Sequence, residues 1–201
     1  MTQPPISFAD ANLRPLPEPT PAWRTGHDVH FYDDDAALMP AVNRFLAEGA
    51  RAGQPMIVIA TSAHRRQMQQ NLAVQLGDAF DTAEITWLDA RDTLAAFMER
   101  DRPNAELFHA TIGNVFANVV GSRSYLVVRA YGEMVDLLWN AGNVNGAIEL
   151  EQLWNEVARK YSFNLLCAYS KGSALKHWHS EAFGHICRHH GTVVPCDAVS
   201  G

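Results

Sequence analysis

Five short apolar runs, separated by longer segments in which apolar residues recur at a helical spacing, most constrain how this chain can fold. The runs are Val29–Tyr32, Met56–Ala60, Ile85–Leu88, Tyr125–Val128 and Phe163–Tyr169. Runs that are apolar on both faces are typical of strands buried between two layers of helices. The alternation therefore predicts an α/β fold with a mostly parallel sheet flanked by helices on both faces.

The segments between these runs predict the helices. An apolar stripe marks residues 36–52, where Pro40 predicts that the regular helix begins near it or that the first turn is distorted. Further helices are expected at residues 63–76, 92–100, 104–120, 133–141, 145–160 and 173–190.

The N-terminal segment differs in composition from the rest of the chain. Residues 1–26 hold six of the ten prolines, which predicts an extended arm, either poorly ordered or used for docking. We expect one domain over residues 27–195 and a short C-terminal tail over residues 196–201.

Composition and charge exclude several classes of protein. The chain has 201 residues and a formal net charge of −6, so we expect no direct binding to nucleic acid, which needs a basic face. No apolar run approaches the roughly 18 residues of a membrane span, and the N-terminus lacks a signal-peptide pattern. Three unevenly spaced cysteines do not form a disulfide framework, so a cytoplasmic location is expected.

Polar and aromatic residues follow the predicted strands and suggest a binding site. In open α/β sheets, ligands bind outside the carboxyl ends of the strands. The candidate ligand-binding residues are Tyr32, Thr61, His64, Arg129, Tyr131, Glu133 and Tyr169. Several also have a structural alternative: Tyr32 and Tyr169 as pocket wall or core, His64 as a helix cap or surface residue, and Arg129 and Glu133 as an ion pair.

The sequence lacks the motifs of common catalytic sites. A phosphate loop needs glycines after a strand and a lysine, but no glycine occurs between His27 and Leu46 and no lysine precedes Lys160. Cys167 lies within an apolar run and is expected to be an inert core thiol. We therefore predict a protein that is not an enzyme and needs no cofactor.

A metal site is a weaker alternative near the C-terminus. His185 and His189 are four residues apart and would share a helix face, with Cys187 between them. Solvated or capping histidines are the competing interpretation.

Several longer segments resemble a known family. The stretch from His27 to Met68, followed by RAYGEMVDLLWNAGN and AIELEQLWNEVARKYSFNLLCAY, resembles the MEDS family, the methanogen/methylotroph, DcmR-type sensory domain. The residues that carry the first part of the resemblance are His27, Phe31, Tyr32, Asp35, Gly49, Gly53, Thr61, His64 and Arg65.

The resemblance implies a RecA/KaiC-like fold that lacks the P-loop, and a sensory role with a hydrocarbon-derived ligand. Because the sequence carries no helix-turn-helix or kinase module, we expect it to signal through a partner such as a histidine kinase or transcription regulator, or through a homodimer. Two alternatives stay open. One is a ligand-independent scaffold for protein interaction, and the other is an enzyme in which His64 and Glu133 act as an acid/base pair.

Overall fold

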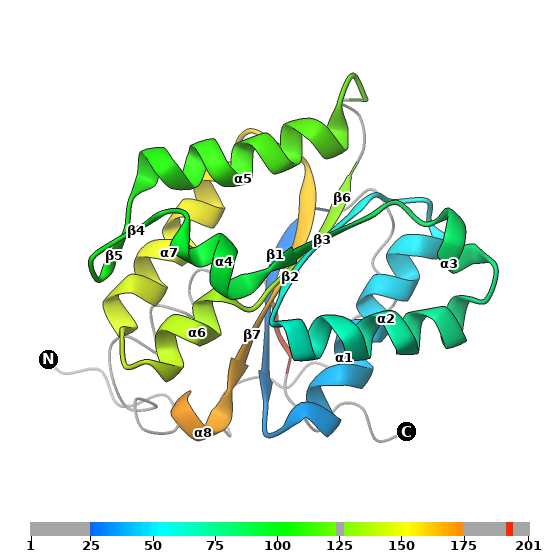
Figure 1. The fold of residues 1–201 in the computed structure, drawn as a ribbon, viewed down its shortest axis with the longest axis horizontal. Helices are drawn as coiled ribbons and strands as arrows, with labels where there is room; N and C mark the ends of the chain where they lie inside the picture. The colour runs from blue at the N-terminus through cyan, green and yellow to red at the C-terminus, as the bar shows by residue number, and fades with distance from the viewer. Residues whose placement is uncertain (1–24, 124–126, 175–191, 195–201) are drawn as a thin grey trace, which may run out of the picture.

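The structure, a computed structural model, describes residues 25–123, 127–174 and 192–194. Within these residues, a six-stranded sheet has the order β3-β2-β6-β7-β1-β8, and all its neighbouring strands are parallel. The strands are β1 (Gly26–Tyr32), β2 (Met56–Ala60), β3 (Ile85–Asp89), β6 (Val128–Gly132), β7 (Phe163–Ser170) and β8 (Thr192–Val194). Figure 1 shows this sheet between two groups of helices, which confirms the predicted fold class.

One face of the sheet is covered by three helices, α1 (Asp35–Arg51), α2 (Ser62–Leu76) and α3 (Ala79–Thr82). Alternate strand residues such as Met56, Val58 and Leu166 point into this layer and pack on Leu38, Leu46 and other buried residues of α1 and α2. Asp34 caps α1 by accepting a hydrogen bond from the amide of Ala37 at 3.0 Å. Pro40 lies inside the helix, which begins at Asp35.

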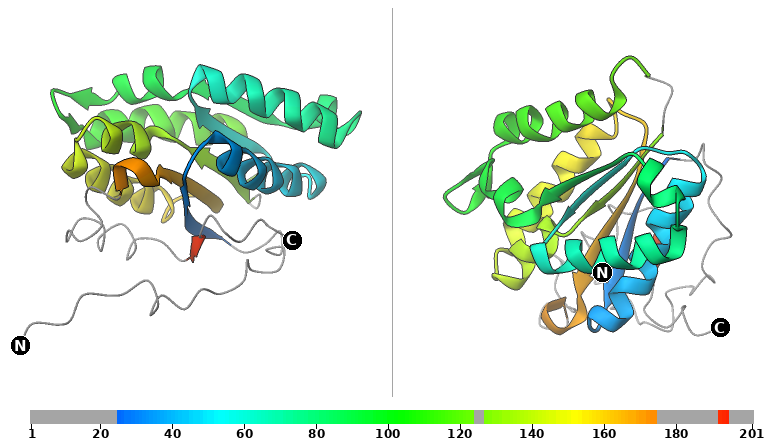
Figure 2. Two further views of the ribbon diagram at one scale, coloured as in Figure 1. Left: turned by 90° about the horizontal axis from the view of Figure 1, so that it is seen from below. Right: turned by 45° about the vertical axis from the view of Figure 1, so that its right-hand side comes forward.

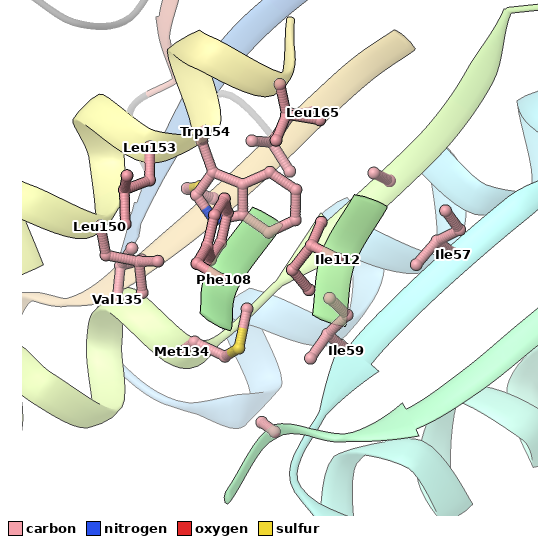
Figure 3. Close-up of a cluster of buried hydrophobic side chains, with 14 of the residues drawn as sticks. Ile57, Ile59, Phe108, Ile112, Met134, Val135, Leu150, Leu153, Trp154 and Leu165 are labelled. Atoms are coloured by element: carbon pink, nitrogen blue, oxygen red, sulfur yellow. The ribbon is translucent and has the colours of Figure 1, made fainter. Parts of the chain in front are cut away.

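The other face is covered by α4 (Ala90–Ala95), α5 (Ala105–Val120), α6 (Met134–Asn140) and α7 (Val144–Val157). Figure 2 shows this second group on the opposite side of the strands from α1 and α2. The interface is a large aliphatic and aromatic core in which Phe108 and Trp154 meet edge to face, with ring centroids 5.5 Å apart (Figure 3). Leu165 and Ile57 supply the sheet side of this core.

The fourth predicted strand is displaced along the chain. The apolar run Tyr125–Val128 suggested a strand there, but β6 spans Val128–Gly132 and includes Arg129 and Tyr131. Residues 125 and 126 lie outside the described residues. The predicted strand stopped one residue before Arg129, whereas in the structure tertiary contacts satisfy the Arg129 guanidinium group and the strand continues through it.

One predicted helix differs from the structure, and another lies largely outside the described residues. In place of a helix over residues 92–100, α4 ends at Ala95 and is followed by an antiparallel pair, β4 (Met98–Glu99) and β5 (Arg102–Pro103). Arg100 has a φ of 56° in the turn between them, a left-handed conformation that a helix cannot contain. Of the helix expected at 173–190, the structure describes only the start, as α8 (Lys171–Ala174). Residues 1–24 of the predicted arm and the predicted tail of residues 196–201 lie outside the described residues, and Gly26, placed in the arm, belongs to β1.

Candidate functional site

Five of the seven predicted site residues converge at the carboxyl edge of the sheet. Tyr32 ends β1, Tyr131 lies next to the end of β6, and Glu133 follows β6 directly. Thr61 follows β2 and caps α2, whose first turn carries His64. The parallel register brings these strand ends side by side, because Ile59 pairs with Gly132 and Tyr32 pairs with Ser170.

Glu133 contacts three of the other four residues at this edge. Its Oε1 accepts a hydrogen bond from the Tyr131 hydroxyl at 3.0 Å and lies 2.6 Å from His64 Nδ1. Its Oε2 accepts a hydrogen bond from the Thr61 amide at 2.7 Å. The Glu133 amide donates to the carbonyl of Ile59 at 3.0 Å, which extends the strand ladder by one residue and fixes the carboxylate in place. Only 5% of the Glu133 side chain is exposed.

His64 lies between two carboxylates. While Nδ1 faces Glu133, Nε2 lies 3.1 Å from Asp35 Oδ1 in the first turn of α1. The hydrogen bond to Glu133, together with the charges of Glu133 and Asp35, raises the pKa of His64 to about 9 although burial opposes the charge. The imidazole is therefore a cation at neutral pH, held between a buried and an exposed acid.

Asp136 forms a second acidic centre beside Glu133. Its Oδ2 accepts a hydrogen bond from the Tyr32 hydroxyl at 2.9 Å, and its Oδ1 accepts one from the Ser170 amide at 2.9 Å. Burial raises the pKa of the Asp136 carboxyl, and the two hydrogen bonds act in the opposite direction. Burial and the neighbouring Asp136 also raise the pKa of Tyr32, so its hydroxyl stays a donor.

We refer to these residues together as the edge cluster. It comprises Tyr32, Asp35, Thr61, His64, Tyr131, Glu133 and Asp136. Sequence reasoning missed Asp35 and Asp136 as site residues. A signal for Asp136 was present, because it is three residues after Glu133 and residues at that spacing share one face of a helix.

Arg129 lies at the other end of the sheet from the edge cluster. It pairs with Met56 near the amino end of β6 and is only 2% exposed. Its guanidinium donates to Gln54 Oε1 at 2.9 Å and to the Phe45 carbonyl at 2.6 Å, pairs with Glu48 at 3.2 Å, and stacks over the Phe45 ring. The salt bridge that Arg129 makes is with Glu48, whereas the acid suggested by the sequence was Glu133.

Tyr169 lies on the opposite face of the sheet from Tyr131. Its ring stacks on Phe31 and meets Trp139 edge to face, and its hydroxyl donates to Glu151 Oε1 at 2.7 Å. Tyr169 therefore belongs to the core beneath α6 and α7, which matches the core alternative considered for it.

A surface groove lies away from the edge cluster. A groove of about 560 Å³ lies between the β4–β5 pair and the start of α7. Its lining residues are Asp101, Arg102, Asn143, Asn145, Ile148, Glu149 and Gln152. None of these lining residues belongs to the edge cluster.

No helix in the described part of the chain combines the length and apolar character that crossing a membrane requires.

The fold and the edge cluster define an α/β domain that carries buried acids and a protonated histidine where such sheets bind ligands. The chain belongs to the MEDS family, described as the MEthanogen/methylotroph, DcmR Sensory domain, whose model matches residues 26–191. No curated protein matches the chain at a significant level. Membership of this family supports a role in sensing and signalling.

Proposed function

We propose that this domain senses a small ligand at the edge cluster and transmits its presence to a signalling protein such as a histidine kinase or a transcription regulator. The observation that carries the proposal is the His64–Glu133 pair, a charged contact of 2.6 Å at the carboxyl edge of the sheet. Burying a charged pair costs desolvation free energy that its attraction often does not repay. A buried pair is therefore weak evidence for a purely stabilising role. Perturbed titratable groups of this kind cluster at functional sites.

The chemistry of the cluster favours a ligand that donates hydrogen bonds. The edge cluster holds three carboxylates, Asp35, Glu133 and Asp136, but one protonated histidine, so it attracts donors and cations more than acids. The ring of Tyr32 borders the Asp136 carboxylate and can contact a short apolar tail, whereas Tyr131 is fully buried. A short alcohol or amine derived from a hydrocarbon fits this combination.

The turn after β1 argues against a nucleotide as the ligand. Asp33, Asp34 and Asp35 occupy the place where a phosphate-binding loop would carry glycines, and three acids there repel phosphate. This supports our interpretation of the domain as a RecA/KaiC-like fold that has lost its P-loop and has been adapted to another ligand.

Ligand binding can change the signalling state through α6. A ligand that hydrogen-bonds to Glu133 competes with His64, and one that reaches Asp136 competes with Tyr32. Glu133 occupies the N-cap position of α6 and Asp136 lies in its first turn, so either exchange alters contacts at the start of this helix. A ligand shifts a conformational equilibrium only through such differences in contacts between two states.

The proposal is tested by NMR titration of the ¹⁵N-labelled chain with ethanol, methylamine, acetate and chloroform. We expect shifts of the Thr61 and Glu133 amides with the alcohol or amine, and binding at least roughly tenfold weaker in Glu133→Gln because one charge-assisted hydrogen bond is lost. The matched control is Glu156→Gln, which removes the acid of an exposed pair with His109 at 2.8 Å. Equal binding by Glu133→Gln, or no shift with any probe, contradicts ligand binding at the edge cluster.

Partner binding is measured separately by pull-down with candidate kinases and regulators. Glu133→Gln is compared with the native chain, and the native chain is compared with and without each probe. If both comparisons give the same captured partner and the same signalling output, a ligand-independent scaffold or dimerisation module explains the domain better.

One observation also favours a second candidate, an enzyme that uses His64 and Glu133 for proton transfer. The two groups are within hydrogen-bonding distance, as an acid/base pair requires. A His64 pKa of about 9 keeps the imidazole protonated near neutral pH, which suits a general acid better than a general base. Conversion of a bound probe over hours in the NMR tube, abolished in His64→Gln, would favour the enzyme.

A further inference from the structure

We propose that His27, Glu151 and Cys167 form a binding site for a divalent transition-metal ion of the zinc class. The three side chains come from the start of β1, the middle of α7 and the middle of β7. One ligand atom from each lies within 4.8 Å of the others. This site is on the α7 face of the sheet and is separate from the edge cluster.

The distances between the three ligand atoms suit one small ion. His27 Nε2 lies 3.1 Å from Glu151 Oε2 and 3.3 Å from Cys167 Sγ, and Cys167 Sγ lies 3.8 Å from Glu151 Oε2. Bonds of about 2.0–2.3 Å to a tetrahedral zinc ion place nitrogen, oxygen and sulfur ligands roughly 3.3–3.6 Å apart. An ion therefore fits with movements of a few tenths of an ångström.

The surrounding side chains support two of the ligands as a metal site requires. Asn155 Oδ1 lies 3.2 Å from His27 Nδ1, and a proton on Nδ1 leaves the Nε2 lone pair directed at the site. Tyr169 donates to Glu151 Oε1 at 2.7 Å, which orients the carboxylate with Oε2 toward His27 Nε2 and Cys167 Sγ. Hydrogen bonds to the outer atoms of ligating histidines and carboxylates are a regular feature of protein metal sites.

The ligand set determines the class of ion. One nitrogen, one sulfur and one carboxylate oxygen suit zinc and its neighbours, whereas magnesium and calcium take oxygen ligands. A cation would also compensate the charge of Glu151, whose side chain is fully buried. The His27 side chain is 9% exposed, so the site adjoins the surface on one side. Three protein ligands leave a fourth coordination position for water or another ligand.

This inference changes the interpretation of Cys167. The sequence suggested an inert core thiol, but the structure surrounds the sulfur with a histidine and a carboxylate. The same three groups could instead form a hydrogen-bonded cluster without an ion, and metal binding distinguishes the two.

The test is titration of the reduced, metal-free full chain with Co²⁺, whose absorption reports thiolate ligation and tetrahedral geometry. We expect one equivalent to bind with a thiolate-to-cobalt charge-transfer band, and Zn²⁺ to displace it. Cys167→Ser should abolish that band, whereas the matched controls Cys187→Ser and Cys196→Ser should keep it. Asn155→Ala should weaken binding by roughly 10–100-fold while the band persists at saturation.

Three results overturn the proposal: no stoichiometric binding of Co²⁺ or Zn²⁺, a charge-transfer band that survives in Cys167→Ser, or a band lost in Cys187→Ser. Since Cys167→Ser alters the core, its fold is checked by circular dichroism. If Cys167→Ser does not fold, two other measurements test the metal site. These are Co²⁺ binding by His27→Gln, which changes the partly exposed ligand, and X-ray absorption of the Co²⁺-bound native chain. Native-like affinity in His27→Gln, or an absorption spectrum without a sulfur ligand, also excludes the site.

Discussion

His64 Nδ1 lies 2.6 Å from Glu133 Oε1, and this contact joins the first turn of α2 to the end of β6 across 69 residues of sequence. The two segments bracket the carboxyl edge of the sheet, so the contact is part of both the fold and the candidate site.

The His64–Glu133 pair should make stability depend on pH in the alkaline range. The pKa of His64 is raised from 6.5 to about 9, so the folded state binds a proton that the unfolded state releases. The stabilisation is fully present below pH 6.5 and is lost as pH rises through about 9. Its upper size is roughly 3 kcal/mol, from about 1.4 kcal/mol for each pKa unit.

Urea denaturation of the native chain and His64→Gln between pH 6 and pH 10 measures this effect. The free energy of unfolding should fall across the range in the native chain and should fall less in His64→Gln. The control is His109→Gln, which removes an exposed histidine with an acidic partner. A pH dependence that is the same in the native chain and in His64→Gln contradicts the prediction.

Glu133→Gln should lower the pKa of His64 toward the ordinary value of about 6.5. The substitution keeps the shape of the side chain but replaces the charged acceptor that chiefly raises this pKa with a neutral one. NMR titration of the imidazole resonances gives the value directly. Glu156→Gln should leave the His64 titration unchanged, and a His64 pKa that stays near 9 in Glu133→Gln would assign the effect to Asp35.

Gly49→Ala should destabilise the domain because Arg129 packs directly against this glycine. A methyl group at residue 49 would lie 2.7 Å from Arg129 Cδ, closer than two carbons can approach, so the buried guanidinium would have to shift. Overpacking of this kind costs about 1–3 kcal/mol, partly offset by the higher helix propensity of alanine.

The matched control for Gly49→Ala is Gly113→Ala in α5, where the new methyl group meets no atom within 4 Å. That variant should be stabilised by up to about 1 kcal/mol. Thermal denaturation of both variants at one pH compares the effects, and equal shifts in Tm would refute the packing argument.

Tyr32→Phe should destabilise the domain through Asp136. The substitution removes the donor at 2.9 Å and leaves the buried carboxylate with fewer hydrogen bonds, which costs about 1–3 kcal/mol. Tyr161→Phe serves as the control, since that hydroxyl makes only a long contact of 3.4 Å with the Gly113 carbonyl. In chemical denaturation at pH 7, Tyr32→Phe should be less stable than Tyr161→Phe. The reverse order would show that the Tyr32–Asp136 hydrogen bond does not stabilise the fold.

Much of the fold could be predicted because the sheet is buried on both faces. Runs such as Met56–Ala60 have no polar residue and are long enough for one strand, so local pattern and tertiary environment agree. The prediction of β6 was displaced because Arg129 interrupts the pattern. Its burial depends on Gln54, Phe45 and Glu48, which are distant in sequence and supply partners that no local pattern reveals.

The candidate site was predictable in part for a topological reason. Residues that directly follow parallel strands lie at the same edge of the sheet. Glu133 and Thr61 could therefore be assigned to one site from the sequence alone. The face on which a strand residue lies was harder to assign. Tyr169 and Tyr131 are both strand tyrosines, yet they lie on opposite faces of the sheet because side chains alternate along a strand and the register is set by pairing.

The sequence by itself determined the class of fold, the lack of a phosphate loop after the first strand and five of the residues that reach the carboxyl edge. These depend on local apolar periodicity and on the residues that directly follow each strand. The tertiary structure alone decided which acids surround His64, where Arg129 finds its partners, and that His27, Glu151 and Cys167 converge. Those contacts join residues 16 to 140 positions apart, and only the packing of helices on the sheet brings such residues within hydrogen-bonding distance.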